Sequence, residues 1–187
     1  LHGLSLYWQL ACYTFSRYKD KEPIESFLEL DESINKDLLA AQVEAVYLVR
    51  DLVNTPAEDM NPAELSQSAL GLVRQYGGHS KHFVGDELLD NNFPLVHTVG
   101  RASENQPELT ICQWGNDGPL ITVVGKGVTF DSGGLNIKPS RAMYPMKKDM
   151  GGAAHAIALC GMILKLKLPC RLKLVIPAVE NAISGRS

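Results

Sequence analysis

The chain has 187 residues, a length sufficient for one domain with a hydrophobic core. Hydrophobic residues make up 45% of it and charged residues 21%, with a formal net charge of −3, as is ordinary for a globular protein. The basic residues are scattered rather than gathered into a basic face, which argues against a nucleic-acid-binding domain, and no apolar run approaches the about 20 residues that cross a bilayer.

The first part of the chain is predicted to be mainly helical. Residues 4–15 are rich in Leu, Tyr and Trp, and their periodicity does not distinguish a buried helix from a strand. A short strand is expected over residues 24–30. Residues 36–53 repeat apolar side chains near a 3.6-residue period and are predicted to form a helix that ends at an Asn-Thr-Pro sequence. A second helix is predicted over residues 62–76, with Asn61 as its cap and proline as its first residue.

The rest of the chain is predicted to alternate strands with a helix, which is typical of an α/β domain. Apolar, β-rich segments predict strands over 79–84, 109–114, 120–124 and 172–176. A glycine-rich stretch over residues 125–134 is interpreted as a loop after the third strand. Residues 151–166 are predicted to form a helix that begins with small residues.

Cysteine and histidine residues show no spacing typical of a metal site. The four cysteines, none of them in a C-x-x-C pair, are Cys12, Cys112, Cys160 and Cys170. Four thiols in a chain of this length do not make a disulfide framework, so we interpret them as reduced core residues of a cytosolic protein. His97 and His155 have no partner at ligand spacing and are assigned to structure.

Chemically unusual residues are concentrated after the predicted strand 120–124. Lys126, Asp131, Lys138 and Asp149 follow it, and their spacing does not place them on one helix face, so a loop must gather them. Active sites of open α/β sheets lie beyond the carboxyl ends of strands, which favours a functional role. Asp149 alone fits equally well a carboxylate at the N-terminus of the following helix. The Gly-Lys-Gly sequence lacks the order of a phosphate-binding P-loop.

Two segments in this region resemble the signature of a known family. The sequence GKGVTFDSGGLNIKP over residues 125–139, followed by MKKDMGGAA over 146–154, resembles the M17 family of leucyl or cytosol aminopeptidases. Residues 13–19, 50–56 and 99–103 resemble further segments of this family, so the resemblance covers nearly the whole chain.

The resemblance also implies a domain organisation. It implies a central mixed sheet flanked by helices, forming the N-terminal part of an M17-type catalytic domain. Residues 1–33 are expected to be the end of a separate N-terminal domain. Residues 34–187 are expected to contain a linker helix and the N-terminal half of the catalytic domain.

Residue roles follow from the resemblance, position by position. It implies that Lys126 and Asp149 are metal ligands and that Asp131 bridges two divalent ions, which would be Zn²⁺, Mn²⁺ or Mg²⁺. A lysine must lose its proton to bind metal, and both a buried site and neighbouring dications favour the neutral amine. Lys138 is expected to stay protonated and stabilise charge on the scissile carbonyl. Met146 is expected to line the pocket for the first side chain of the substrate.

The implied activity is that of a two-metal aminopeptidase, which removes leucine-like residues from peptides with free N-termini. By resemblance the intact protein is expected to be a cytoplasmic homo-hexamer with no membrane or nucleic-acid partner. The family's second signature, NTDAEGR, which supplies two more carboxylate ligands and an arginine, does not occur in this sequence. We therefore expect the family pattern to continue past Ser187 and the isolated chain to be inactive. The alternative is a non-catalytic member with a structural or DNA-binding regulatory role.

Overall fold

The computed structural model describes residues 1–20 and 27–185. Its helices and 3-10 turns are α1 (His2–Ala11), α2 (Lys36–Asn54), η1 (Ala57–Asp59), α3 (Pro62–Tyr76), α4 (Glu87–Asp90), α5 (Pro94–Gly100), α6 (Ser140–Met143), η2 (Met146–Met150) and α7 (Gly151–Lys165). Its strands are β1 (His79–Val84), β2 (Glu108–Trp114), β3 (Leu120–Val124), β4 (Gly127–Asp131) and β5 (Arg171–Asn181). No helix within these residues is long and apolar enough to cross a membrane.

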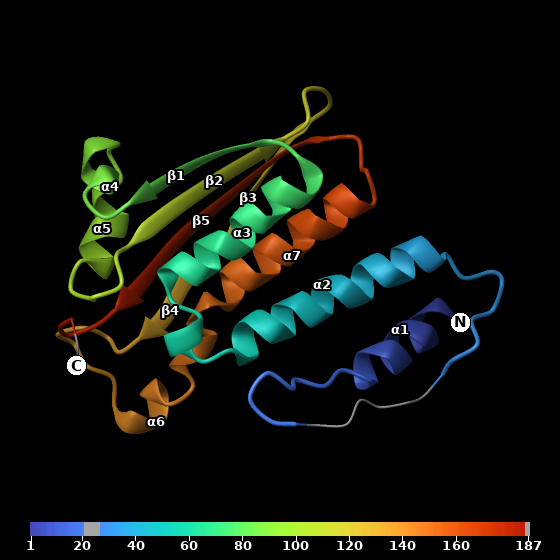
Figure 1. Cartoon of the computed structure of the whole chain (residues 1–187), viewed down its shortest axis with the longest axis horizontal. Coiled ribbons are helices and arrows are strands. Elements are labelled where there is room, and N and C mark those ends of the chain that lie inside the picture. The colour runs from blue at the N-terminus through green and yellow to red at the C-terminus, as the bar shows by residue number, and fades with distance from the viewer. Residues whose placement is uncertain (21–26, 186–187) are drawn as a thin grey trace.

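The strands form one mixed sheet, as the resemblance implied. Its strand order is β1-β2-β5-β3, and β4 also pairs with β5. The β1–β2 and β2–β5 pairs are antiparallel, whereas β3 and β4 both run parallel to β5, beside its first and second halves respectively. Figure 1 shows α3 and α7 lying along one face of this sheet, with α2 packed beside α7 and α1 outermost. The strand β5 therefore holds the sheet together, since three other strands pair with it.

The two longer predicted helices of the first half are confirmed, and local signals explain where they begin. The side chain of Asn35 accepts a hydrogen bond from the backbone N–H of Leu38 at 3.0 Å, which caps α2. The predicted cap Asn61 accepts one from the N–H of Glu64 at 3.1 Å, with Pro62 at the first position of α3. These side chains satisfy donors that the first turn of a helix leaves free.

Other parts of the prediction need correction. In the ambiguous segment over 4–15, residues 4–11 belong to the helix α1, and residues 12–15 are neither helix nor strand. Of the strand expected over 24–30, residues 24–26 lie outside the described residues and 27–30 form no strand, because no described strand pairs with them. The glycine-rich stretch 125–134 contains the strand β4, and β5 continues to Asn181 because β4 pairs with its second half. The short helices α4 and α5 were not predicted.

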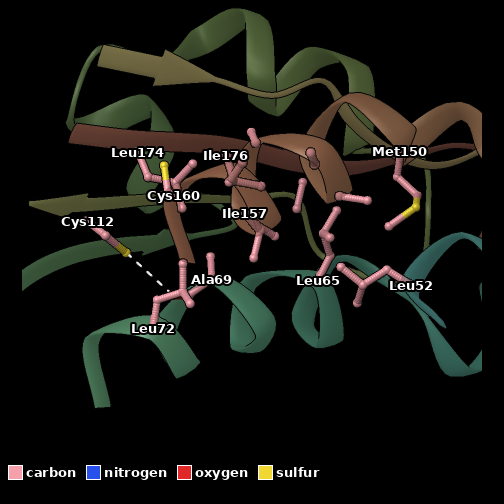
Figure 2. Packing of buried hydrophobic residues seen from close by; sticks show 14 of the residues in the cluster. Leu52, Leu65, Ala69, Leu72, Cys112, Met150, Ile157, Cys160, Leu174 and Ile176 are labelled. Atoms are coloured by element: carbon pink, nitrogen blue, oxygen red, sulfur yellow. Dashed lines mark hydrogen bonds between the residues drawn. The ribbon is translucent and has the colours of Figure 1, made fainter. Parts of the chain in front are cut away.

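The core lies between the sheet and the helices α3 and α7. Leu65 of α3, Ile157 of α7, and Leu174 and Ile176 of β5 are buried and point into this layer, as Figure 2 shows. Burial of such side chains is the dominant favourable term in folding. The buried thiols Cys112 and Cys160 belong to the same core. Cys12 and Cys170 are free but only half-buried, so the prediction of core thiols is right for two of the four cysteines.

Candidate metal centre

The segment between β3 and β4 lies directly against the first turn of α7. The backbone N–H of Gly125 donates to the carbonyl oxygen of Val175 in β5 at 3.1 Å. A Cβ at Gly125 would lie 2.6 Å from the Cα of Ala153, closer than such atoms approach, so only glycine fits this contact. The N–H of Ala153 donates to the carbonyl oxygen of Lys126 at 2.9 Å. The Gly-Lys-Gly sequence thus places Lys126 beside the N-terminus of α7.

Lys126 faces Asp149, one of the other predicted metal ligands. Its Nζ lies 2.9 Å from Oδ2 of Asp149, and the two side chains are 60% and 16% exposed. The pair lacks hydrogen-bonding geometry, so the buried Oδ2 has no hydrogen-bond partner within the described structure. The side chain of Lys126 is mostly exposed, which differs from the expectation of a buried site. Asp149 lies in η2 and makes no capping hydrogen bond to α7, which removes its alternative role as a cap.

The carboxylate of Asp131 lies at the end of β4 and accepts hydrogen bonds on both oxygens. Its Oδ2 lies 2.8 Å from Nζ of Lys138, the predicted catalytic lysine. Its Oδ1 accepts from Nδ2 of Asn181 at 2.7 Å and from the N–H of Gly133 at 3.0 Å. Burial alone would raise the pKa of the Asp131 carboxyl. The hydrogen bonds from Lys138, Asn181 and Gly133, with the charge of Lys138, outweigh this effect and lower the pKa below its usual value.

The loop that connects Asp131 to Lys138 is shaped by its glycines. Gly133 has φ of +91°, a conformation that disfavours other residues, and a Cβ there would lie 2.3 Å from the carbonyl oxygen of Asn136. The N–H of Lys138 donates to the carbonyl oxygen of Ser132 at 2.9 Å and closes the loop. This turn returns the chain so that the Lys138 ammonium reaches the Asp131 carboxylate.

Met146 and the two histidines singled out in the sequence are not part of the lysine–carboxylate pairs. Met146 begins η2 and is half-buried, whereas Met150 at its end is fully buried in the core. Nζ of Lys147 donates to the carbonyl oxygen of Asn54 at 2.7 Å and ties η2 to the end of α2. Of the two lone histidines, His97 contacts Asp86 and His155 bonds to the carbonyl of Gly151, so both have structural partners.

The three predicted metal ligands offer atoms of the kind that divalent metals bind. Asp131 and Asp149 provide carboxylates and Lys126 provides an amine, and Oδ2 of Asp149 already faces the positive charge of Lys126. Within residues 1–20 and 27–185, however, no three His, Cys, Asp or Glu side chains gather closely enough to hold a metal ion. The donor set therefore fits a metal but is incomplete. Asn181, which contacts Asp131, was missed because its sequence position carries no signal for this contact.

Comparison with protein families agrees with the family resemblance found in the sequence. Residues 47–187 match the model of the cytosol aminopeptidase family, catalytic domain. Among curated proteins, the chain is 37% identical over 166 residues to Peptidase B of Cronobacter sakazakii, covering 84% of this chain and 39% of that protein. It is 38% identical over 148 residues to a probable cytosol aminopeptidase of Chlamydia felis, covering 77% of this chain and 30% of that protein.

Solved structures show the same relationship. The crystal structure of a cytosol aminopeptidase from Coxiella burnetii superposes with a TM-score of 0.93 at 43% identity, covering 100% of this chain and 40% of that one. The bottromycin maturation enzyme BotP in complex with Mn superposes with a TM-score of 0.85 at 30% identity, covering 97% and 40%. The chain therefore spans 30% to 40% of the length of these relatives.

Proposed function

This chain belongs to the cytosol aminopeptidase family, the M17 peptidases, and we propose that the full-length protein is a two-metal aminopeptidase that removes leucine-like residues from peptides. The observation that carries the proposal is the facing pair of Lys126 and Asp149, in which a buried carboxylate oxygen has no hydrogen-bond partner among the described residues. Here the ammonium of Lys126, 2.9 Å away, supplies the positive charge that this buried anionic oxygen requires, and a divalent cation would supply it in the metal-bound protein.

Each residue of the site has a proposed task. Lys126, Asp131 and Asp149 would hold two divalent ions, of which Zn²⁺, Mn²⁺ and Mg²⁺ are the candidates. When bound, such ions polarise the scissile carbonyl and activate water. The ammonium of Lys138 would stabilise the negative oxygen that develops on that carbonyl, as a preorganised donor does in acyl-transfer enzymes. The thioether of Met146 would contact the first side chain of the substrate and adapt to different apolar shapes.

The 187-residue chain alone is proposed to bind metal weakly and to have no activity. It contains three of the five protein ligands that the family resemblance implies, and its described carboxylates do not form a three-ligand cluster. Divalent ions of this kind need several oxygen or nitrogen ligands, so two carboxylates and one amine are too few. The full-length protein is proposed to be cytoplasmic and hexameric, with peptides rather than membranes or nucleic acids as partners.

The proposal is tested by a peptidase assay on the full-length protein. Metal-free enzyme should gain activity on leucine p-nitroanilide when Mn²⁺ is added and lose it on chelation. The same substrate with an acetylated amino group should not be cleaved, because a free N-terminus is required. Full-length protein that stays inactive with Mn²⁺, Zn²⁺ and Mg²⁺ would point to a non-catalytic member. Turnover by the 187-residue chain alone would contradict the proposed incompleteness of its site.

A further inference from the structure

The geometry points to Asn181 as a positioning residue that orients the Asp131 carboxylate for metal binding, an inference that rests on the proposed metal site. Asn181 is the last residue of β5, and its Nδ2 donates to Oδ1 of Asp131 at 2.7 Å. In the described structure its side chain makes no hydrogen bond to another predicted ligand. It therefore acts on the site through Asp131, as residues behind metal ligands commonly do.

A bulge in β4 brings these two residues opposite each other. Val128 pairs with Val179, but Phe130 already pairs with Glu180, so Thr129 is the extra residue of the bulge. Asp131 therefore lies opposite Asn181. With an unbroken register Asp131 would lie opposite Ala182, whose side chain has no donor. Thr129 is buried, and its hydroxyl donates to the carbonyl oxygen of Val179 at 3.2 Å, which fixes the bulge. Bulges of this kind redirect side chains beside functional sites.

The hydrogen bond from Asn181 determines which oxygen of Asp131 faces a cation. Oδ1 accepts from both Asn181 and the N–H of Gly133, so its two lone pairs are engaged. Among the described residues, Oδ2 contacts only the ammonium of Lys138, at 2.8 Å. The carboxylate is thus held with Oδ2 toward the positive charge. Without the Asn181 donor, only the N–H of Gly133 and the Lys138 ammonium would hold this orientation in the described structure.

The backbone of Asn181 supports the same loop. Its carbonyl oxygen accepts from the N–H and the hydroxyl of Ser132, at 3.0 and 2.7 Å. The carbonyl oxygen of Ser132 in turn accepts a hydrogen bond from the backbone N–H of Lys138. A Cβ at Gly134 would lie 2.9 Å from Oδ1 of Asn181, so the glycine leaves room for the amide group. The end of β5 therefore positions Asp131 directly and the Lys138 segment through Ser132.

The neighbouring residue Glu180 provides a matched control. Adjacent strand residues point to opposite faces, and Oε2 of Glu180 accepts from Ser103 at 2.7 Å and from Nδ2 of Asn105 at 2.8 Å. Asn105→Ala therefore removes an asparagine hydrogen bond to the same end of β5. It leaves the Asp131 carboxylate untouched.

The experiment is calorimetric titration of metal-free, full-length protein with Mn²⁺. Asn181→Ala and Asn181→Ser, which both remove the Nδ2 donor, should weaken Mn²⁺ binding about 10- to 100-fold. Asn105→Ala should bind Mn²⁺ as the wild type does. In an Asp131→Ala background, Asn181→Ala should cause no further loss of affinity, because Asn181 acts through Asp131. A merely structural role would give the same loss in both backgrounds.

The outcomes separate two kinds of failure. Wild-type protein that binds no Mn²⁺, Zn²⁺ or Mg²⁺ overturns the proposed function. Wild-type protein that binds metal while both folded Asn181 variants bind it equally well overturns the inference about Asn181 alone. An additional loss from Asn181→Ala in the Asp131→Ala background also overturns it. Circular dichroism of the metal-free variants establishes that they are folded, and Asn181→Ser serves if Asn181→Ala is not.

Discussion

Lys126 and Asp149 face each other across 2.9 Å without a hydrogen bond between them. Replacing Asp149 by Asn keeps its size and removes its charge. In the full-length protein we expect Asp149→Asn to weaken Mn²⁺ binding at least 10-fold, because a carboxylate ligand is lost. The urea unfolding free energy of the metal-free protein should change by less than about 1 kcal/mol, since the ion pair is partly exposed. Unchanged metal affinity in a calorimetric titration would exclude Asp149 as a ligand.

Lys138 is predicted to act on the substrate rather than to hold metal. Lys138→Met in the full-length protein should lower kcat by about 10²- to 10³-fold, the usual effect of losing one donor to a developing oxyanion. Bound metal, measured by elemental analysis of the purified enzyme, should not decrease. Lys147→Met is the matched control, since Nζ of Lys147 bonds only to a backbone carbonyl in the described structure. Equal losses of kcat in the two variants would argue against the assigned role.

Leu65 tests whether the layer between α3 and the sheet holds the site in place. Its side chain is 0% exposed, and Leu65→Ala should lower the unfolding free energy by about 2 to 5 kcal/mol through lost burial and a cavity. The same change at Leu95, which is 80% exposed, should alter it by less than about 0.5 kcal/mol. Urea unfolding of both variants followed by fluorescence gives the comparison. Similar effects at the two positions would contradict the assigned core.

Local sequence signals were enough for some elements and not for others. The helices α2 and α3 could be predicted because their caps and apolar periods lie within a few residues of each other. The strand β4 was predicted to be a loop, since the glycines in and around it and its bulge at Thr129 obscure the alternating pattern of a strand. Its pairing with β5 depends on residues about fifty positions away, which local periodicity does not report.

The candidate site likewise contains residues that the sequence located and one that it did not. Family resemblance located Lys126, Asp131, Lys138 and Asp149, and the structure brings them together as two lysine–carboxylate pairs. Their metal-binding and catalytic roles stay predictions. The contact of Asn181 with Asp131 could not be predicted, because it depends on the exact register of a parallel strand pair rather than on any motif.

The buried thiols predict a selective reactivity. Burial raises the pKa of Cys112 to about 11 and that of Cys160 to about 12, in the latter case helped by neighbouring thiols. Since the thiolate is the reactive form, neither should react with Ellman's reagent at pH 8 in the native protein. Among the four cysteines of this segment, peptide mapping should find only Cys12 and Cys170 modified. Modification of Cys112 before unfolding would contradict the described core.

The same thiols predict how stability depends on alkaline pH. An unfolded thiol ionises near pH 9, whereas Cys112 and Cys160 stay protonated in the fold up to about pH 11 and 12. The unfolded state therefore binds fewer protons in this window, and the unfolding free energy should fall as pH rises from 9 to 12. The fall should be on the order of 2 kcal/mol per thiol. Replacing both cysteines by Ala should flatten the profile measured by urea unfolding, and an equally steep profile would exclude the thiols as its cause.

The order of strands also has a consequence for synthesis on the ribosome. The strand β5 is the last of the described strands to be made, yet it lies between β2 and β3 in the sheet. Until residue 181 has left the exit tunnel of the ribosome, β3 and β4 lack β5, their described partner. The segment around Lys126 and Asp131 then has no neighbouring strand to hold it in place. The nascent chain would expose unpaired apolar strands during this interval, a state in which chains are prone to aggregate. Residues far from Lys126 and Asp131 in sequence, including Val175 and Val179, thus govern when the candidate site first takes shape during translation.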